Sequence, residues 1–338
     1  MRSILMPTLS SPPSRSPRKL DSVSLNVELT AVIAAATSAE PRVLTLRTGR
    51  DEPDSLPSGP LAADHRTLEA GLRAWVEEQT EQKLGYVEQL YTFGDRDRLD
   101  AQAGGRSHVL SVAYLALVRE ARPAGLVAAT WKSWYGYFPW EDWRQGRPGA
   151  LEVIEPALKG WGGTGEQDLQ RLRRERIELT FGFDSGAWND ERVLERYELL
   201  FEAGLVPETS RHPDASSPPN SVFAPGDPML LDHRRMLATA IGRLRGKIKY
   251  RPVIFELMPP AFTLLELQRT VEALSGVRLH KQNFRRLVES QGLVEETGEV
   301  ATETGGRPAR LVRFRREVLH ERLAPGLRLA GARRATLP

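Results

Sequence analysis

The chain has 338 residues, 40% of them apolar and 27% charged, which is typical of a globular protein with two ordinary domains. It contains no cysteine, which excludes disulfides, thiol catalysis and cysteine-ligated zinc. No apolar run reaches the roughly 18 residues of a membrane span. Residues 1–24 lack the apolar segment of a signal peptide, so we expect a disordered tail and a cytoplasmic protein.

The net charge of +3 is unevenly distributed along the chain. From Arg234 to the C-terminus there are 21 Lys and Arg against 10 Asp and Glu, a net charge of +11, so the preceding residues carry −8. A strongly basic segment indicates that the C-terminal part binds a polyanion. A solvated basic surface or a basic tail would give the same count, so motifs must decide between these interpretations.

The first domain is predicted over residues 25–205. Alternating and small apolar residues at 24–36 and 43–46 predict strands, and a Gly/Pro-rich loop follows at 49–60. A helix is predicted over 68–79, with Thr67 as its N-cap and Leu72 and Val76 on its buried face. The β-rich runs at 86–93 and 108–118 predict neighbouring antiparallel strands.

Seven aromatic residues lie between residues 130 and 144: Trp131, Trp134, Tyr135, Tyr137, Phe138, Trp140 and Trp143. Such a cluster is more often core or interface than ligand pocket. The acids Glu141 and Asp142 favour the rim of a pocket, and stacking on an adenine or nicotinamide ring would use the same aromatic side chains. Both interpretations stay open from the sequence.

The following segment is predicted as a charged helix at 167–176, a strand at 177–183 and a helix at 190–203. Residues 206–228 are rich in Pro, Ser and Asp and are predicted to be a linker. A long helix is predicted over 229–247, with Leu230, Leu237 and Ile241 on its apolar face. His233 lies on the same face, as expected of a buried core histidine. Residues 229–320 form the second predicted domain, and 321–338 a basic tail.

Two short helices are predicted at the start of the basic segment. Thr263 and Glu266 form a capping box before an apolar helical face, and Gly276 supplies a left-handed stop. A second helix is predicted over 280–291, anchored by Phe284 and Val288. A strand from 293, a Gly-Gly-Arg-Pro turn at 305–308 and a strand at 309–314 follow. This order predicts a winged helix-turn-helix.

The face of the second helix opposite its anchors carries side chains that recognise base edges, because Gln and Asn pair with adenine and Arg pairs with guanine. On the wing, arginines would meet phosphate or a minor groove. The predicted DNA-binding residues are Lys281, Gln282, Asn283, Arg285, Arg286, Arg307 and Arg310. Two amphipathic helices with a basic face also occur in domains that do not bind DNA; the hairpin and the segment charge disfavour that alternative.

The loop and helix from Gly59 share part of the Nudix box, in which glutamates hold Mg²⁺ against a diphosphate. Arg73, Glu77 and Glu78 fit the pattern, whereas His65 and Ala74 replace acids and Thr80 replaces a glycine. On its own, this partial match is also what a solvated helix face would show.

The wider arrangement resembles the bacterial Nudix-related transcriptional regulators of NAD metabolism, over residues 25–320. The resemblance is carried by Gln89–Asp95 (QLYTFGD), Val109–Val118 (VLSVAYLALV), Leu231–His233, Gly242–Tyr250 (GRLRGKIKY), Phe262–Gln268 (FTLLELQ), Asn283–Arg286 (NFRR) and Gly305–Arg310 (GGRPAR). It implies an α+β protein in which a Nudix-like α/β/α sandwich precedes a C-terminal winged helix-turn-helix. It also implies a homodimer that binds a double-stranded DNA operator and represses genes of NAD biosynthesis or salvage.

The resemblance implies an NAD-related nucleotide, such as NAD or ADP-ribose, as effector, with no cofactor required. The aromatic segment and residues 145–225 depart from the compact family form and fit a longer subgroup. Ala74 and His65 remove metal-ligand positions, so we expect ligand binding with negligible hydrolysis and at most a weak Mg²⁺ site at Glu77 and Glu78. The candidate ligand-binding residues are Arg47, Arg50, Arg73, Glu77, Glu78, Tyr91 and Phe93.

Two other functions compete with this prediction. An active Nudix-type pyrophosphohydrolase with an accessory domain is disfavoured by His65, Ala74 and Thr80. A winged helix that binds RNA or protein is disfavoured by the base-reading face, since A-form RNA hides its major groove from a helix. For the leading hypothesis, we expect ligand binding to change the angle between two winged helices of a dimer, with the helix at 229–247 transmitting the change.

Overall fold

The computed structural model describes residues 24–47, 49, 52–81, 83–94, 107–119, 129–211, 223–301, 308–321 and 326–327. All of the predicted N-terminal tail except Ser24, and nearly all of the predicted C-terminal tail, lie outside these ranges. Within them, no helix combines the length and apolar character needed to cross a membrane.

A six-stranded sheet forms the N-terminal half, in the order β4-β5-β1-β2-β6, with β3 paired to β1. The strands are β1 (Ser24–Ala36), β2 (Pro41–Leu46), β3 (Ser58–Pro60), β4 (Tyr86–Phe93), β5 (Ser107–Leu117) and β6 (Ala129–Ser133). β1 and β5 are parallel, with Leu29 opposite Val112. The predicted antiparallel pairing of 86–93 with 108–118 is confirmed by β4 and β5.

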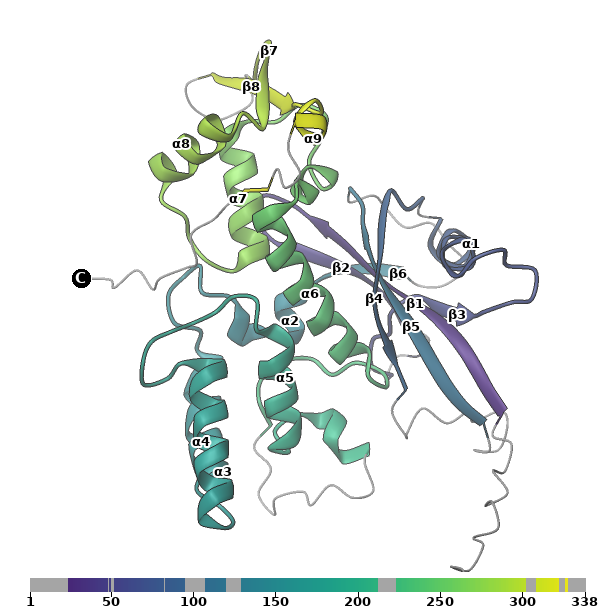
Figure 1. Cartoon of the computed structure of the whole chain (residues 1–338), viewed down its shortest axis with the longest axis vertical. Coiled ribbons are helices and arrows are strands. Elements are labelled where there is room, and N and C mark those ends of the chain that lie inside the picture. The colour runs from purple at the N-terminus through teal and green to yellow at the C-terminus, as the bar shows by residue number, and fades with distance from the viewer. Residues whose placement is uncertain are drawn as a thin grey trace, which may run out of the picture.

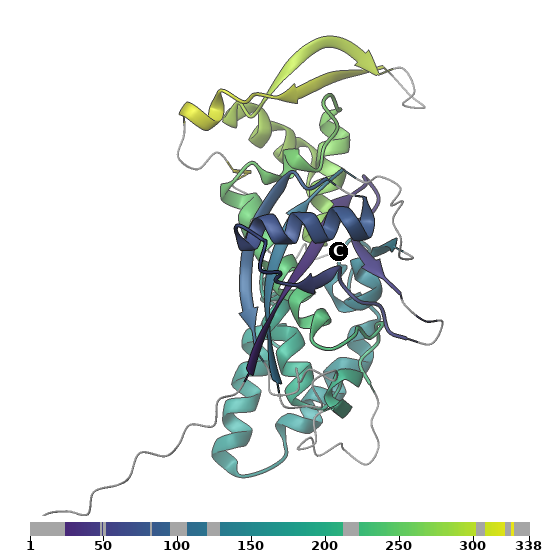
Figure 2. The same cartoon turned by 90° about the vertical axis from the view of Figure 1, so that its right-hand side faces the viewer.

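Both faces of the sheet are buried, each by a different partner. On β1, Leu29 and Ile33 contact the apolar cluster beneath α1 (Leu68–Thr80), whereas Val32 and Ala34 belong to the core on the other face. This alternation follows from the period of two along a strand. Figure 2 shows α1 lying across the outer face of the sheet. The predicted cap of α1 is confirmed, because the Thr67 hydroxyl accepts a 3.1 Å hydrogen bond from the amide of Ala70.

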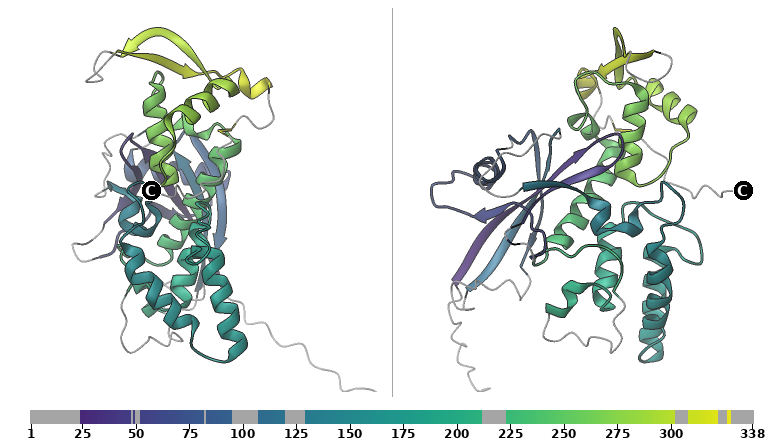
Figure 3. Two further views of the ribbon diagram at one scale, coloured as in Figure 1. Left: turned by 90° about the vertical axis from the view of Figure 1, so that its left-hand side faces the viewer. Right: turned by 180° about the vertical axis from the view of Figure 1, so that it is seen from behind.

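A layer of helices covers the other face of the sheet, with α6 running through the middle of the molecule (Figure 1). The elements that follow β6 are α2 (Trp134–Tyr137), the 3-10 turn η1 (Pro139–Glu141), α3 (Ala150–Gly162), α4 (Gln167–Phe181), α5 (Val193–Glu202), η2 (Pro207–Arg211), α6 (His233–Tyr250) and η3 (Val253–Glu256). Figure 3 shows α3 and α4 as an antiparallel hairpin at the end of the molecule away from the wing.

The predicted strand at 177–183 is wrong, because α4 continues as a helix to Phe181. Ile177, Leu179 and Phe181 alternate with polar residues, which is the pattern of a half-buried strand. In the structure Ile177 and Phe181 are buried together on one helix face, while Leu179 is 54% exposed. Burial four residues apart is the helical spacing.

The long predicted helix is confirmed with shifted ends, since α6 begins at His233. Leu230 precedes the helix and is 39% exposed, so it is not part of the buried face. His233 is buried, and its Nδ1 accepts a 3.0 Å hydrogen bond from the amide of Leu56. This supports its assignment as a core histidine.

The segment predicted as a linker is packed at both of its described ends. Val206 and Ala224 are buried, and Glu208 contacts Arg234 at 3.4 Å. One continuous apolar core includes residues of the sheet, of α5 and α6, and of the C-terminal helices. Where the structure describes it, the segment 206–228 is therefore not a spacer between two separate cores.

The C-terminal elements stand at one end of the molecule (Figures 1 and 3). They are α7 (Leu264–Ser275), α8 (Lys281–Gln291), β7 (Val294–Ala301), β8 (Ala309–Phe314) and the short α9 (Val318–Glu321). β7 and β8 pair antiparallel, and Phe262 adds a bridge to Val312. The predicted order of two helices and a hairpin is confirmed.

Candidate nucleic-acid interface and effector domain

α8 presents its polar face to solvent. Phe284 and Val288 are buried and fix the helix against the core. All five of the predicted residues on this helix are exposed: Lys281, Gln282, Asn283, Arg285 and Arg286. A helix whose outer face carries Gln, Asn and Arg has the donors and acceptors needed to read base edges in a major groove.

Contacts among these side chains are weak and local. Arg286 donates a 3.3 Å hydrogen bond to the Asn283 amide oxygen, and Arg285 lies 3.5 Å from Glu289. Exposed pairs of this kind contribute about 0–1 kcal/mol, so DNA would displace them at little cost.

The turn between α7 and α8 is held by a buried carboxylate that the sequence analysis missed. Glu272 is 4% exposed and accepts hydrogen bonds from the Leu279 amide (2.9 Å), Gln268 (2.9 Å) and Arg278 (3.0 Å). The signal in the sequence was the spacing of Gln268 and Glu272, four residues apart on the buried side of α7. The predicted capping box is confirmed, with Thr263 and Glu266 bonded reciprocally at 2.6 and 3.1 Å.

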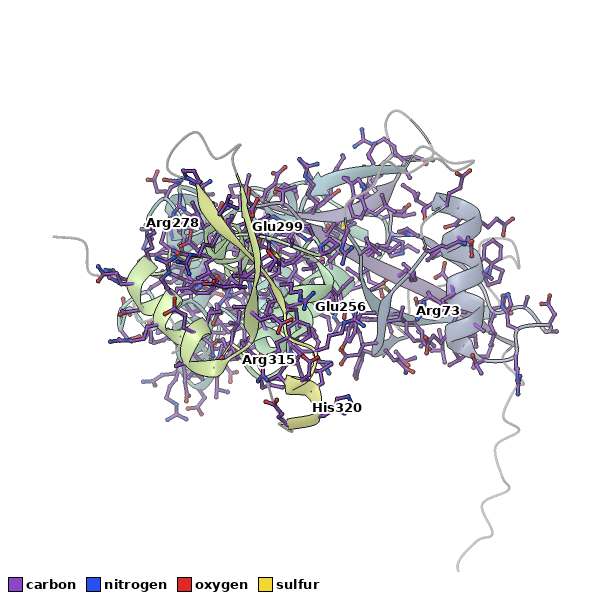
Figure 4. The ribbon with its side chains drawn as sticks, turned by 90° about the horizontal axis from the view of Figure 1, so that it is seen from above. Arg73, Glu256, Arg278, Glu299, Arg315 and His320 are labelled. Carbon is purple, nitrogen blue, oxygen red and sulfur yellow. The ribbon has the colours of Figure 1, made fainter. Side chains whose placement is uncertain are left out.

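Two arginines of the wing are paired with glutamates. Arg310 forms a 2.6 Å ion pair with Glu296 across the hairpin, and Arg313 does the same with Glu295. Arg310 remains 74% exposed and stays a candidate phosphate contact, although it has a carboxylate partner in the free protein. Arg307 lies outside the described residues. Figure 4 looks down on this end of the molecule and shows Glu299 on the hairpin.

The candidate ligand residues of α1 lie on its outer side, far from the winged helix. Arg73 bonds to Glu69 at 2.8 Å and to the Gly85 carbonyl at 3.1 Å, and Figure 4 shows it on the opposite side of the molecule from Arg278. Glu77 and Glu78 are exposed. Among the described residues, no three acidic or histidine side chains come together as a metal site.

Two further residues of α1, which the sequence analysis did not select as ligand residues, hold the short strand β3 in place. Trp75 donates a 2.7 Å hydrogen bond to the Pro60 carbonyl, and Gln79 donates one of 2.8 Å to Ser58. The Trp75 ring covers Gly59, where an added Cβ would overlap the indole. The glycine at the start of the partial Nudix box therefore has a packing role here.

The remaining candidate ligand residues do not gather with those of α1. Phe93 belongs to the core on the face of the sheet opposite α1. Tyr91 packs against it edge-to-face, with ring centroids 5.5 Å apart. Tyr91 is 64% exposed. Arg50 lies outside the described residues. The structure thus divides the candidate set between two faces of the sheet.

Arg47 is engaged in a polar cluster around Asp54, which is 2% exposed. Asp54 accepts from Arg47 (3.0 Å), Lys132 (2.5 Å) and the Tyr137 hydroxyl (2.6 Å). Burial opposes the charge of this carboxylate, but the bonds from Lys132 and Tyr137 outweigh it and hold the pKa of Asp54 below its ordinary value. Burial and the neighbouring carboxylate both raise the pKa of Tyr137.

The aromatic segment forms core. Trp134, Tyr137, Phe138 and Trp140 are at most 1% exposed, which decides between the two interpretations left open by the sequence. The expectation of a pocket rim at Glu141 is wrong, because this carboxylate is fully buried between Arg196 (2.6 Å) and Arg245 (2.7 Å). Asp142 pairs with Arg144 at 2.8 Å. A carboxylate with two guanidinium partners tolerates burial that an unpaired one does not.

Comparison with known proteins identifies relatives for the C-terminal part and for the fold. Residues 254–314 match the family of the NrtR DNA-binding winged helix domain. Over 86 residues the chain is 43% identical to the ADPR responsive transcriptional repressor NtrR of Acinetobacter baylyi. That alignment covers 25% of this chain and 34% of the relative, so the match spans about a third of the relative's length.

Two solved structures match nearly the whole chain. Shewanella oneidensis NrtR in complex with a 27mer DNA aligns with a TM-score of 0.51 at 20% identity, over 87% of this chain and 95% of its own. A MutT/nudix family protein from Enterococcus faecalis aligns with a TM-score of 0.50 at 17% identity, over 89% and 90%. The chain therefore has the fold of these proteins, a Nudix-like domain followed by a winged helix, and its residues 254–314 form a winged helix domain of the NrtR type.

Proposed function

We propose that this protein is a DNA-binding transcription regulator, acting as a repressor, whose N-terminal domain responds to an NAD-related nucleotide. The observation that carries the proposal is the exposed face of α8, from Lys281 to Arg286, in a domain that matches the NrtR DNA-binding family. The name of the Acinetobacter relative, an ADPR responsive transcriptional repressor, supports both halves of the proposal.

The target is duplex DNA read through the major groove. An α-helix enters the major groove of B-DNA, where each base pair shows a distinct pattern of donors and acceptors. We further propose that the protein binds as a homodimer, because one helix of 11 residues covers only one half-site of an operator. The operator is expected upstream of genes for NAD biosynthesis or salvage.

The test is fluorescence anisotropy at fixed salt, with labelled duplexes from upstream of NAD-biosynthesis genes and a scrambled duplex as control. We expect the operator duplex to bind at least about 10³-fold more tightly than the scrambled one. Equal affinity for all duplexes would overturn the proposal. Single-stranded RNA and double-stranded, A-form RNA of the same sequence are measured as well. Preference for either RNA would favour the RNA-binding alternative.

The effector proposed first is ADP-ribose. NAD, nicotinamide mononucleotide and ATP are tested as alternative effectors. Calorimetric titration of each nucleotide identifies the ligand, and an unchanged operator affinity with all four would remove the sensor half of the proposal. Because the candidate residues lie on two faces of the sheet, Arg73→Ala and Tyr91→Ala assign the face. Arg73→Ala tests the α1 side, and Tyr91→Ala tests the exposed ring on β4.

We propose that hydrolysis is negligible. In a Nudix hydrolase several carboxylates hold divalent metal and activate water. Here Ala74 and His65 stand at two acid positions, Glu77 and Glu78 are exposed, and in the part of the chain that the structure describes no third acid joins them in a cluster. These residues do not fit a hydrolytic Mg²⁺ centre, so no step through the metal is assigned. Release of AMP from ADP-ribose with Mg²⁺ at the turnover of ordinary hydrolases would support the pyrophosphohydrolase alternative instead.

A further inference from the structure

The C-terminal end of α7 is capped by residues outside the winged helix. The last carbonyls of a helix have no partner within it and need donors from elsewhere. Here the Tyr135 hydroxyl donates to Ala273 O at 2.7 Å, and Arg245 Nε donates to Leu274 O at 2.9 Å. The amide of Trp143 donates to Gly276 O at 2.7 Å.

The side-chain donors are held rigidly. Arg245, on α6, is fully buried and forms its 2.7 Å ion pair with Glu141. Tyr135 is 9% exposed, with Arg144 stacked over its ring at 5.3 Å and Trp134 against its edge. Because these contacts fix both donors, a change in the angle of α7 would lengthen or break the two bonds.

The same turn of chain also binds the sheet. Tyr137, two residues after Tyr135 on α2, donates a 2.6 Å hydrogen bond to Asp54, and its carbonyl accepts from Arg234 at 2.5 Å. Asp54 in turn binds Lys132 on β6. One short helix thus contacts the N-terminal sheet through Tyr137 and the first helix of the winged domain through Tyr135.

We propose that Tyr135 is a positioning residue for DNA recognition: its hydroxyl caps α7, so that the angle at which α8 meets DNA is set by α2 of the N-terminal domain. The proposal rests on the DNA-binding function proposed above. It assigns part of the recognition geometry to a residue about 120 positions before the winged domain, outside the basic segment. Tyr135 itself does not contact DNA.

The test is Tyr135→Phe, which removes the hydroxyl and keeps the ring in its packing. The matched control is Tyr197→Phe, a buried tyrosine whose ring packs against Phe138 and Phe201. Three quantities are measured without effector, so that a wrong effector does not affect the result. They are the ratio of operator to scrambled-duplex affinity, amide hydrogen exchange over residues 273–283, and the thermal midpoint.

We expect Tyr135→Phe to lower the affinity ratio about threefold to tenfold, the weight of one buried hydrogen bond. Binding of the scrambled duplex should not change, and exchange should rise at 273–283. Tyr197→Phe, which keeps these ring contacts, should leave the ratio and that exchange unchanged. Provided that the wild-type protein distinguishes the two duplexes, an unchanged ratio overturns the proposal, with or without faster exchange, as does an equal loss in the control.

The two proposals fail differently. If the wild-type protein does not distinguish operator from scrambled duplex, the proposed function fails. The exchange measurement then decides the positioning of α7 by itself. Faster exchange confined to 273–283 in Tyr135→Phe supports the capping role, and wild-type exchange there overturns it.

Discussion

Gly276 lies so close to Glu141 that a Cβ atom at Gly276 would overlap the carbonyl oxygen of Glu141. The same atom would lie 2.9 Å from the Tyr135 hydroxyl and 3.0 Å from Arg245. Gly276 also has φ +75°, the left-handed conformation that ends α7. The close approach lets the C-terminal end of α7 contact the buried polar network around Glu141. Gly276 therefore both ends α7 in the left-handed conformation and allows the helix end to pack against this network.

Gly276→Ala is therefore expected to lower both stability and operator affinity. A left-handed alanine costs about 1–2 kcal/mol, and the overlap with Glu141 adds to that cost. Gly292→Ala is the matched control, because Gly292 ends α8 with φ +57° and the nearest atom to its Cβ would be an Arg315 nitrogen 3.6 Å away. Urea unfolding should show a larger loss for Gly276→Ala, and equal losses would mean that the close approach has no energetic weight.

Glu141→Gln should destabilise the fold strongly. The change leaves Arg196 and Arg245 buried beside a neutral amide, and breaking a buried ion pair in this way costs about 3–5 kcal/mol. Glu155→Gln is the control, since Glu155 pairs with Arg147 and Lys159 at the surface, where such pairs contribute about 0–1 kcal/mol. A loss below about 1 kcal/mol in Glu141→Gln, measured by chemical unfolding, would contradict the role of this network.

The Asp54 cluster predicts a pH dependence of stability. Because the folded-state pKa of Asp54 is lowered, its stabilisation is complete above the ordinary value of 3.8 and is lost as the pH falls through the lower folded value. Asp54→Asn should therefore cost about 1–3 kcal/mol at pH 7, and less at pH 3.5.

The measurement is the free energy of unfolding of both proteins at the two pH values. Asp168→Asn on α4, where the carboxylate is 88% exposed, provides the control and should show almost no difference at either pH. A deficit of Asp54→Asn that stays constant between pH 7 and pH 3.5 would show that the charge of Asp54 is not what stabilises the cluster.

Arg286→Ala should weaken operator binding more than binding to scrambled DNA. Its guanidinium is exposed on the face of α8 that we propose to read base edges, and a bidentate contact to guanine is worth about 1–3 kcal/mol of discrimination. Arg171→Ala, on α4 at the other end of the molecule, is the control and should bind both duplexes like the wild type. Equal losses for the two duplexes would place Arg286 on phosphate only.

Local signals in the sequence were sufficient to predict helix ends and buried helix faces, because these features depend on residues within the same element. The Thr67 cap, the Thr263–Glu266 capping box and the anchors Phe284 and Val288 were predicted, because each depends on residues within about one or two helical turns. The exposed face of α8 follows directly from those anchors. Its five candidate residues lie where the sequence placed them.

Where a sequence pattern is compatible with both a strand and a helix, tertiary packing decides which of the two forms. The alternation at 177–183 predicted a strand, yet the core accepts Ile177 and Phe181 from a helix and leaves Leu179 exposed. The grouping of the candidate ligand residues also depended on tertiary packing. Arg73 and Phe93 are each on an expected element, but the sheet separates them, and sequence spacing does not report which face a neighbouring element covers.

The sequence by itself determined a winged helix whose second helix exposes Gln, Asn and Arg, a partial Nudix box and a basic C-terminal segment, because short-range periodicity and composition carry those features. Only the tertiary structure decided that the aromatic segment is core and that Glu141 joins the two halves of the chain. Its partners Arg196 and Arg245 are 55 and 104 residues away, so the burial of all three is set by the packing of distant helices rather than by any local pattern.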